Sequence, residues 1–401
     1  MKTYQNEGLS KRKYGVEQNQ IQPIRNDTKL DDLASRILKK VQQGDNMKKA
    51  IEFGIIGVGQ AGGRLSGQFE KLGYKCLNIN TSEQDLAESP TTNKLVIGNK
   101  IGAGRDLKIG AEAINTYKAV IINKVVGTFG NLKQIIICCG SSGGSGGGGV
   151  INLLRILKES RYSCGVITTL PLNSEDTRSK NNTLIVLNDL VKYSIAEKMS
   201  PFIIVDNAKI EKKYPGLSTL EFWNKANDDV VKCFNLFNVL AAKSSSYTSF
   251  DPADYTKLIH SGGCMIFGQM TIDGSISEGT LAESINKNID SGLLADGFNL
   301  MEATHAACVI IGSKELLYKL PRAAEENAFQ LLNQLLGSGT IFKGVYELPQ
   351  LDHIEVIFMI GGLGLPGVRI KSLVKSTKEE VEHLEKKAPL RTVDDILKDM
   401  D

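Results

Sequence analysis

The 401-residue chain lacks several features that would assign it early to a functional class. Its four histidines (His260, His305, His353 and His383) are far apart and lack the spacing of metal ligands. Its seven cysteines form no CxxC pair, which favours small core side chains in a reducing compartment over disulfides or zinc sites. No GxxxxGK[ST] string occurs, and this absence excludes a P-loop NTPase.

Long hydrophobic runs and a strong charge imbalance are also missing. No stretch reaches the roughly 18 apolar residues that a membrane helix needs, and no apolar segment near the N-terminus resembles a signal peptide. We therefore expect a cytoplasmic protein without membrane insertion. The formal net charge of +3 is small for this length, so direct nucleic-acid binding is not expected.

What is present from residue 51 onward is an alternation of short apolar runs with helical stretches. This alternation predicts parallel βαβ units, and hence an α/β fold with a doubly wound, mostly parallel sheet. A long central helix follows, and then a second domain of α+β type. The expected strands of the first domain are 53–58, 76–79, 95–97, 134–139, 166–170 and 201–205, and its expected helices include 110–125 and 148–158.

The pattern divides the chain into five parts. Residues 1–50 form an N-terminal extension with a short amphipathic helix, and 51–218 form the nucleotide-type domain. Residues 219–243 form the central helix, 244–375 the second domain and 376–401 a charged helical tail. The second domain carries strands near 264–268, 305–311 and 353–360. Thr377 and Glu380 have the spacing of a capping box, which predicts a helix start at the tail.

Two glycine-rich loops follow predicted strands and open helices. The first, residues 57–63, reads Gly-Val-Gly-Gln-Ala-Gly-Gly and also matches the GxGxxG string of dinucleotide-binding proteins. The second, residues 140–149, consists entirely of glycine and serine. Glycines let backbone N–H groups approach a phosphate, and a helix N-terminus adds partial positive charge. Neither loop contains lysine, so backbone amides and a metal ion would neutralise the phosphates.

These loops resemble those of the tubulin/FtsZ superfamily. Residues 142–148 are similar to its GGGTG[ST]G signature, with serine for threonine and glycine for one hydroxyl residue. Further motifs follow in the family's order. Residues 56–63 resemble the first phosphate loop, 80–84 the NTDAQ loop, 102–110 the GAGANPEIG loop, and 169–171 with Glu175 the ribose loop. Two features of the chain resemble the plasmid and phage branch of the family, the TubZ-like proteins. The tail is short, and a 50-residue extension precedes the first strand.

The resemblance implies GTP/GDP and Mg²⁺ as ligands. Asn207 resembles an asparagine that contacts the nucleoside, while Trp223 and Asn227 are spaced as a base-stacking ring and a guanine-reading amide. Arg178 follows Glu175 by three residues, where FtsZ has an arginine after four. The metal ligands are not identified. The predicted nucleotide-binding residues are Gly59, Gln60, Ala61, Gly62, Arg64, Thr81, Gly102, Ala103, Gly104, Gly143, Gly144, Ser145, Gly146, Gly147, Glu175, Arg178, Asn207, Trp223 and Asn227.

Residues 249–254 resemble the family's N-x-D-x-x-D loop, with Ser249 at the first position. The resemblance implies that Asp251 and Asp254 enter the nucleotide pocket of the next subunit and orient water for GTP hydrolysis. Assembly would then activate the GTPase and build a head-to-tail homopolymer. The alternative is a surface loop whose aspartates cap a helix.

Three functions remain open at the level of sequence. A TubZ-like filament would segregate or position plasmid or phage DNA through a DNA-binding adaptor. An FtsZ-type filament would serve cell division. An NAD-dependent oxidoreductase would use the first glycine loop, although Asn80 follows the second predicted strand in place of the acidic residue that holds a ribose. A related protein that binds nucleotide without hydrolysing it is a further alternative. Asp251 and Asp254 argue against it, because such a protein would not need them.

Overall fold

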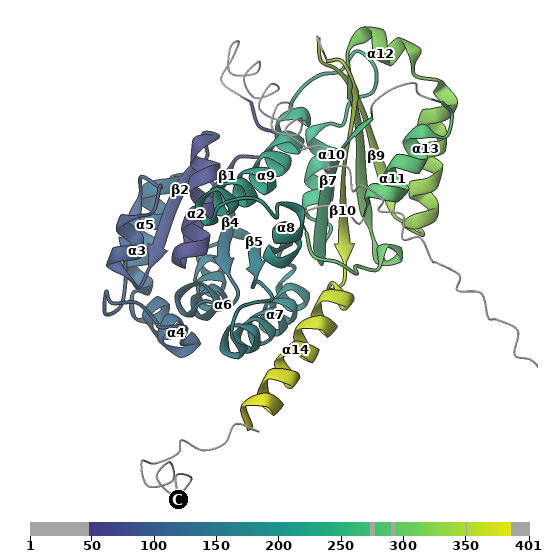
Figure 1. The fold of residues 1–401 in the computed structure, drawn as a ribbon. Helices are drawn as coiled ribbons and strands as arrows, with labels where there is room; N and C mark the ends of the chain where they lie inside the picture. The colour runs from purple at the N-terminus through teal and green to yellow at the C-terminus, as the bar shows by residue number, and fades with distance from the viewer. Residues whose placement is uncertain (1–47, 273–276, 290–293, 350, 386–401) are drawn as a thin grey trace, which may run out of the picture.

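A computed structural model describes residues 48–272, 277–289, 294–349 and 351–385 (Figure 1). The predicted N-terminal amphipathic helix and most of the predicted tail lie outside these residues. Ten strands form one sheet, in the order β3-β2-β1-β4-β5-β6-β7-β10-β8-β9. The strands are β1 (Phe53–Val58), β2 (Lys75–Asn80), β3 (Lys94–Val96), β4 (Gln134–Gly140), β5 (Ser163–Leu170), β6 (Phe202–Asp206), β7 (Cys264–Ile272), β8 (His305–Gly312), β9 (Thr340–Glu347) and β10 (Ile354–Leu363).

The first six strands are mutually parallel and mark the predicted doubly wound half of the sheet. Every residue of β1 is buried, as expected for a parallel strand covered on both faces. A Cβ atom at Gly54 would meet Phe129 of α5 (Lys118–Phe129), whereas one at Gly57 would meet Gly62 of α2 (Gly59–Lys71). Because side chains alternate along a strand, these two helices cover opposite faces.

The helices around this half form two layers. Helix α2 packs on α9 (Thr219–Leu240), and the other layer joins α5 to α4 (Leu107–Thr116), α6 (Gly144–Glu159) and α7 (Thr177–Glu197). The short helices α3 (Glu83–Ala87) and α8 (Asn207–Lys213) follow β2 and β6. The carboxyl ends of β1, β2, β4, β5 and β6 therefore meet at one edge of the sheet, where ligands bind in open α/β folds.

The second half of the sheet is mixed. Strand β7 runs parallel to β6, but they pair only at Phe202 with Cys264 and Ile203 with Met265. Strand β10 is antiparallel to β7 and β8, and β9 is parallel to β8. The connecting helices are α10 (Pro252–Ile259), α11 (Thr280–Asn288), the 3-10 turn η1 (Leu300–Glu302), α12 (Lys314–Lys319) and α13 (Arg322–Leu335).

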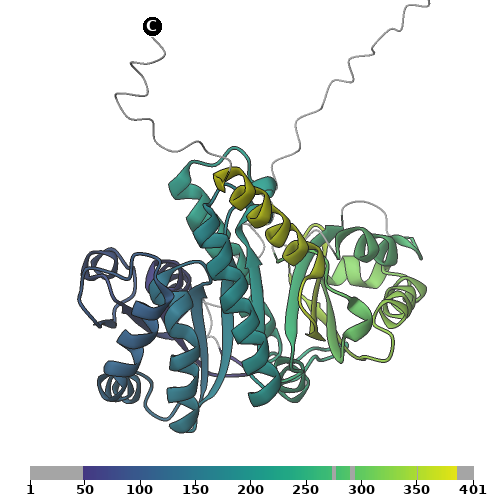
Figure 2. The ribbon, with the colours of Figure 1, turned by 90° about the horizontal axis from the view of Figure 1, so that it is seen from below.

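Two long helices link the halves. Helix α9 packs on α2 and on β7, and α14 (Gly367–Glu385) leaves the end of β10 and packs against α7. Seen from below, α14 crosses from the green C-terminal strands to the teal helices of the first half (Figure 2). The C-terminal elements are thus tied to the nucleotide-type half by side-chain packing as well as by the sheet.

Three predicted helix boundaries are wrong. The predicted helix 110–125 is two helices, α4 and α5, that break at Tyr117, whose hydroxyl bonds to the carbonyl of Gly98. Helix α6 begins at Gly144, so the glycines form its first turns instead of preceding it. Thr377 lies inside α14 and donates its hydroxyl to Leu373, so it caps no helix start.

Candidate nucleotide-binding site

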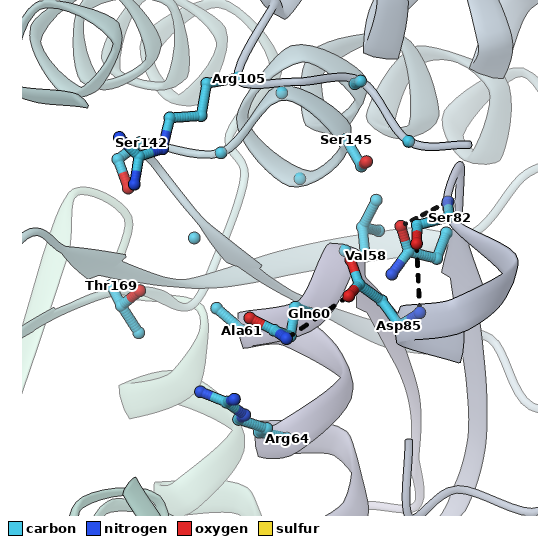
Figure 3. Close-up of a pocket in the computed structure, with 18 of the residues that line it drawn as sticks. Val58, Gln60, Ala61, Arg64, Ser82, Asp85, Arg105, Ser142, Ser145 and Thr169 are labelled. Atoms are coloured by element: carbon cyan, nitrogen blue, oxygen red, sulfur yellow. Dashed lines mark hydrogen bonds between the residues drawn. The ribbon is translucent and has the colours of Figure 1, made fainter. Parts of the chain in front are cut away.

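A cavity of about 550 Å³ lies at the carboxyl edge of the parallel strands (Figure 3). Its walls come from the loops after β1, β2, β4, β5 and β6, from the loop before α4, and from the first turns of α9. Segments distant in sequence therefore converge on one hollow, as the positions of the glycine loops predict.

Two helix N-termini face this cavity. Helix α2 begins at Gly59 and α6 at Gly144, and neither helix has an acidic residue in its first turn. The partial positive charge at both N-termini is therefore not offset by a carboxylate within either first turn, which favours an anion between them. Gly59 adopts a φ of +72°, and a Cβ atom there would lie 3.1 Å from the nitrogen of Gly146. Only glycine allows the two loops to approach so closely.

Two arginines add full positive charge from opposite sides of the cavity (Figure 3). Arg64 is half-buried, and its guanidinium carbon lies 5.5 Å from the centre of the Trp223 ring. Burial lowers the pKa of Arg64 from its usual value, and the charge of Asp85 opposes that effect. Arg105 adopts a left-handed backbone conformation with φ of +59° and forms an ion pair with Asp176.

The cavity also holds a polar donor without a partner. Asn80 is 1% exposed, and its Oδ1 accepts from the N–H of Ser82 at 3.1 Å. Its Nδ2 has no hydrogen-bond partner among the described residues. A buried amide in that state costs free energy unless a ligand accepts from it, so Asn80 is suited to an anionic oxygen.

The opposite end of the cavity is built for a flat ring with polar edges. Trp223 lies in the second turn of α9, and Asn227 follows one turn later on the same helix. The side chains of Asn207 and Asn227 are 7% and 8% exposed, and both line the cavity. An aromatic ring beside two amides, each able to donate and accept, suits a purine base.

Glu175 lies on the wall between these two ends. It belongs to the loop that joins β5 to α7, and its Oε1 accepts from the N–H of Leu172 at 3.0 Å. The second carboxylate oxygen remains available to a ligand hydroxyl group.

Most of the predicted binding residues line the cavity. Sequence reasoning missed others, although several of them belong to the motifs already quoted. The predicted residues on the wall are Gly59, Gln60, Ala61, Arg64, Gly102, Ala103, Gly104, Gly143, Gly144, Ser145, Gly146, Glu175, Asn207, Trp223 and Asn227. The residues missed are Val58, Asn80, Ser82, Gln84, Asp85, Ile101, Arg105, Gly140, Ser142 and Thr169.

Four predicted residues do not line the cavity, for identifiable reasons. Cβ atoms at Gly62 and Gly147 would lie 2.1 Å from the Cys138 carbonyl oxygen and 2.6 Å from that of Ser141, so both glycines serve close packing. Thr81 is buried behind the wall, with its hydroxyl 2.6 Å from that of Ser145. The Arg178 side chain is 58% exposed, and its Nη2 lies 3.8 Å from Asp106 Oδ2.

Asp251 and Asp254 lie away from the cavity. Helix α9 has 22 residues and spans about 33 Å at 1.5 Å per residue. Trp223 is near its start, and both aspartates follow its end. Asp251 is the N-cap of α10 and accepts from the N–H of Asp254 at 2.9 Å. Burial, and then the charge of Asp251, raise the pKa of Asp254.

The cavity lies at the edge of a parallel sheet. One end of it has two glycine-rich helix N-termini, and the other end has an aromatic ring beside two amides. These features define a nucleotide-binding α/β protein. Comparison with known families narrows this class. Residues 52–215 match the family model described as the Tubulin/FtsZ family, GTPase domain. Residues 236–374 match the Tubulin/FtsZ-like protein TubZ-like, C-terminal domain. The chain belongs to the tubulin/FtsZ family.

Individual relatives agree with this assignment. The chain is 25% identical to the tubulin-like protein CetZ of Pyrococcus horikoshii over 77% of its own length and 85% of that protein. It is 22% identical to the tubulin-like protein TubZ of Bacillus cereus, but the match spans only 56% of each chain. Its fold matches the GTPγS-form protofilament of Bacillus thuringiensis TubZ with a TM-score of 0.79, at 20% identity and covering 88% and 99% of the two chains.

Among the described residues, no helix is long and apolar enough to cross a membrane. The same part of the chain contains no group of three or more histidine, cysteine or acidic residues that could enclose a metal ion.

Proposed function

We propose that this chain is a polymerising GTPase that binds GTP in the cavity and hydrolyses it when a neighbouring subunit completes the site. The observation that carries the proposal is the placement of Asp251 and Asp254 at the far end of α9 from the pocket. Subunits that stack head to tail would bring that end of one molecule against the pocket of the next.

The pocket has the parts that a triphosphate requires. The first turns of α2 and α6 present backbone N–H groups, and Arg64, Arg105 and Asn80 add donors. Catalysis of phosphoryl transfer consists largely of positioning and charge stabilisation, which these groups supply.

Mg²⁺ fits this donor set as an ion held mainly by phosphate oxygens and water, since Mg²⁺ usually retains several waters and takes one or two protein ligands. Asp85 and the Ser145 hydroxyl are the groups on the wall that would hold it. When bound, the ion neutralises charge that develops on the phosphates.

Guanine is the base that the pocket suits. Its O6 accepts while N1 and N2 donate, and the amides of Asn207 and Asn227 can meet both requirements. Trp223 provides a stacking surface on the same helix as Asn227. Adenine reverses the donor and acceptor pattern at that edge, but amide side chains can rotate. Selection of GTP over ATP thus depends on how firmly the amides are held.

Hydrolysis needs a water molecule oriented towards the terminal phosphate. Asp251 uses one carboxylate oxygen to cap α10, which leaves the other oxygen exposed. Asp254 follows in the first turn of the same helix, so both carboxylates are held at a fixed spacing. These groups would arrive only with the adjoining subunit, so an isolated subunit would bind GTP and turn it over slowly.

The same contact determines the assembly. A head-to-tail contact joins different surfaces on each subunit, and repetition without closure builds an open filament. The relative with the similar fold is described as a protofilament, which supports this part of the proposal.

For the biological role we propose the segregation or positioning of plasmid or phage DNA in the cytoplasm through a DNA-binding adaptor. The match of residues 236–374 to the TubZ-like C-terminal domain supports this branch. An FtsZ-type role in cell division is the second candidate within the family. The family match argues against the NAD-dependent oxidoreductase.

The test combines 90° light scattering with measurement of phosphate release in the presence of GTP, GDP, ATP or NAD. We expect scattering and phosphate release with GTP, both reduced by EDTA. Equal responses to ATP, or phosphate release without assembly, would contradict the proposal. Capture of partners from the host cell would then separate a DNA-bound adaptor from division proteins.

A further inference from the structure

Helix α14 reaches the wall of the nucleotide pocket from the opposite half of the molecule. It follows β10, crosses beneath the sheet and packs along α7 (Figure 2). Its first turn is attached to segment 294–297, where the N–H of Gly367 bonds to the carbonyl of Gly297 at 2.8 Å and the N–H of Arg369 to that of Asp296 at 3.3 Å. This attachment fixes where the Arg369 side chain enters the protein.

Arg369 is 7% exposed and contacts three groups around the pocket wall. Its Nη1 donates to Asn173 Oδ1 at 2.8 Å, and its Nη2 donates to the Pro171 carbonyl at 2.9 Å. Its Nε lies 2.9 Å from Asp206 Oδ2 in an ion pair. The planar guanidinium therefore joins the loop that carries Glu175 to the end of β6.

The ion pair between Arg369 and Asp206 lies beside the end of the pocket that suits a base. Asp206 is the N-cap of α8, accepts from the N–H of Ala208 at 3.2 Å, and immediately precedes Asn207. It is 3% exposed, and burial raises its pKa while Arg369 opposes that effect. A buried carboxylate needs such a partner, so Arg369 stabilises the turn that presents Asn207.

A second contact from α14 holds the other end of the Glu175 loop. Glu380 forms an ion pair with Lys180, which is 2% exposed, and accepts from the Thr177 hydroxyl at 2.7 Å. Thr177 and Lys180 lie in the first turns of α7, directly after the loop. Arg369 and Glu380 lie eleven positions apart on one helix and thus hold residues 171–180 from both ends.

We propose that α14 sets the position of the ribose wall of the nucleotide pocket, and that Arg369 and Glu380 are positioning residues for Glu175 and Asn207. Neither residue touches the cavity itself, so each acts through the wall. The inference rests on the proposed function, because the wall is taken to read the ribose of a bound GTP. Ribose selectivity would then depend on α14, a helix of the C-terminal half.

The experiment uses the only tryptophan of the chain, Trp223, as a fluorescent reporter inside the pocket. The full chain is titrated with GTP and with 2′,3′-dideoxy-GTP, at protein concentrations below the onset of light scattering. The ratio of the two Kd values measures ribose selectivity. A site that hydrogen-bonds a hydroxyl group rejects an analogue without it, so the wild type should favour GTP strongly.

Three variants weaken the wall to different extents. Arg369→Lys keeps a charge for Asp206 but cannot form the guanidinium fork, so we expect the ribose selectivity to fall about tenfold, equivalent to the loss of one or two hydrogen bonds. Asn173→Ala and Glu380→Gln remove single partners that are not fully buried, and each should lower the selectivity about threefold. Both should fold, because Asn173 is exposed and because glutamine at position 380 keeps an amide oxygen that can accept from Lys180. Arg322→Gln, which breaks an exposed pair with Glu326 on α13, is the matched control and should change nothing.

The outcomes separate this inference from the proposed function. If the wild type binds GTP and prefers it to the dideoxy analogue, yet all three variants keep that preference, then α14 does not set the wall and the inference is wrong. A wild type that binds GTP without any preference would overturn it as well. A wild type that does not bind GTP at all would overturn the proposed function, and the inference with it.

Discussion

At the scale of single residues, Asp251 has an observed role in capping α10 and a proposed role in hydrolysis, and a mutation must keep the two apart. Its side chain caps α10 by accepting from the N–H of Asp254. Replacing an aspartate N-cap with alanine costs about 1 kcal/mol of stability, whereas asparagine caps a helix as well as aspartate does. Asp251→Asn therefore removes the charge proposed for hydrolysis and leaves the helix intact.

We predict that Asp251→Asn and Asp254→Asn lower the GTP turnover of assembled protein by about 100-fold or more, in line with the loss of a positioned catalytic group. GTP affinity of the monomer should stay unchanged, because neither residue lines the pocket. Phosphate release and Trp223 fluorescence measure the two quantities. Polymer should persist longer than in the wild type. Wild-type turnover in both variants would remove these carboxylates from the mechanism.

Glycines in the two loops differ in what they do. A Cβ atom at Gly62 would lie 2.1 Å from the carbonyl oxygen of Cys138, whereas one at Gly127, in the exposed interior of α5, would meet nothing within 4 Å. We predict that Gly62→Ala lowers the free energy of unfolding by about 1–3 kcal/mol through overpacking. Gly127→Ala should raise it by about 0.5–1 kcal/mol. Urea unfolding of both variants measures the contrast, and equal effects would show that close packing at Gly62 does not matter.

The sequence predicts the binding loops better than the role of each residue within them. The glycine strings identify the two loops that face the pocket, although α6 begins at Gly144, before its predicted start at 148. Trp223 and Asn227 line the pocket as their spacing indicates. Whether a glycine faces a ligand or a neighbouring strand depends on a third element, here the carbonyl of Cys138, which no local pattern reveals. Arg105 lines the pocket through its left-handed backbone, which also cannot be deduced from residue type.

At the scale of elements, the start of β10 contains a buried polar cluster. Glu355 is fully buried, accepts from Thr271 Oγ1 at 2.5 Å and Gln269 Nε2 at 3.3 Å, and lies 2.9 Å from His353 Nε2. The side chain of Asp352 contacts the other ring nitrogen of His353 at 2.6 Å. Hydrogen bonding to Glu355 raises the pKa of His353 although burial opposes it, and Asp352 adds to the increase.

This raised pKa determines the sign of a pH effect. The protonated ring is favoured in the folded state, so its contribution to stability is complete below the pKa of the unfolded chain, about 6.5. The contribution is lost as the pH rises through the higher folded pKa. We predict that His353→Gln lowers the free energy of unfolding more at about pH 6 than at about pH 8.5. Urea unfolding of both proteins at the two pH values checks this, and a pH-independent difference would contradict it.

Element boundaries show where sequence reasoning ends. The alternation of apolar runs predicts the six parallel strands, because the inner ones are buried on both faces, whereas β3 at the edge is only partly buried. The break between α4 and α5 has no glycine or proline, since it follows from a contact between Tyr117 and Gly98. Thr377 and Glu380 have capping-box spacing, but Glu380 pairs with Lys180 across the molecule, so a tertiary contact explains its place.

At the scale of the whole molecule, the pocket and the carboxylate pair lie at opposite ends of α9. A subunit with both parts cannot bring them together by itself. We predict that GTP turnover per subunit rises with protein concentration and falls to a small residual rate, about 100-fold lower, on dilution below the point of assembly. Phosphate release measured across a dilution series, with light scattering on the same samples, tests this. Constant turnover per subunit would mean that the site is complete in a monomer.

The division of the chain at 218, 243 and 375 stays a prediction. The strands of both halves form one sheet, and α14 runs without a break through position 375. Composition indicates where the pattern of strands and helices changes, but it cannot show that a helix from the last part of the chain packs against α7.

The narrow contact between β6 and β7 has a mechanical consequence. Strands β6 and β7 pair at two positions, and a bridge between Val205 and Leu294 adds one more link, so a small twist between the halves would disturb few backbone hydrogen bonds. The packing of α9 on α2 and β7, and of α14 on α7, also spans the two halves and would oppose such a rotation. A force applied to one end of the molecule would therefore reach the other end through two helices, both of which carry or hold residues of the pocket wall.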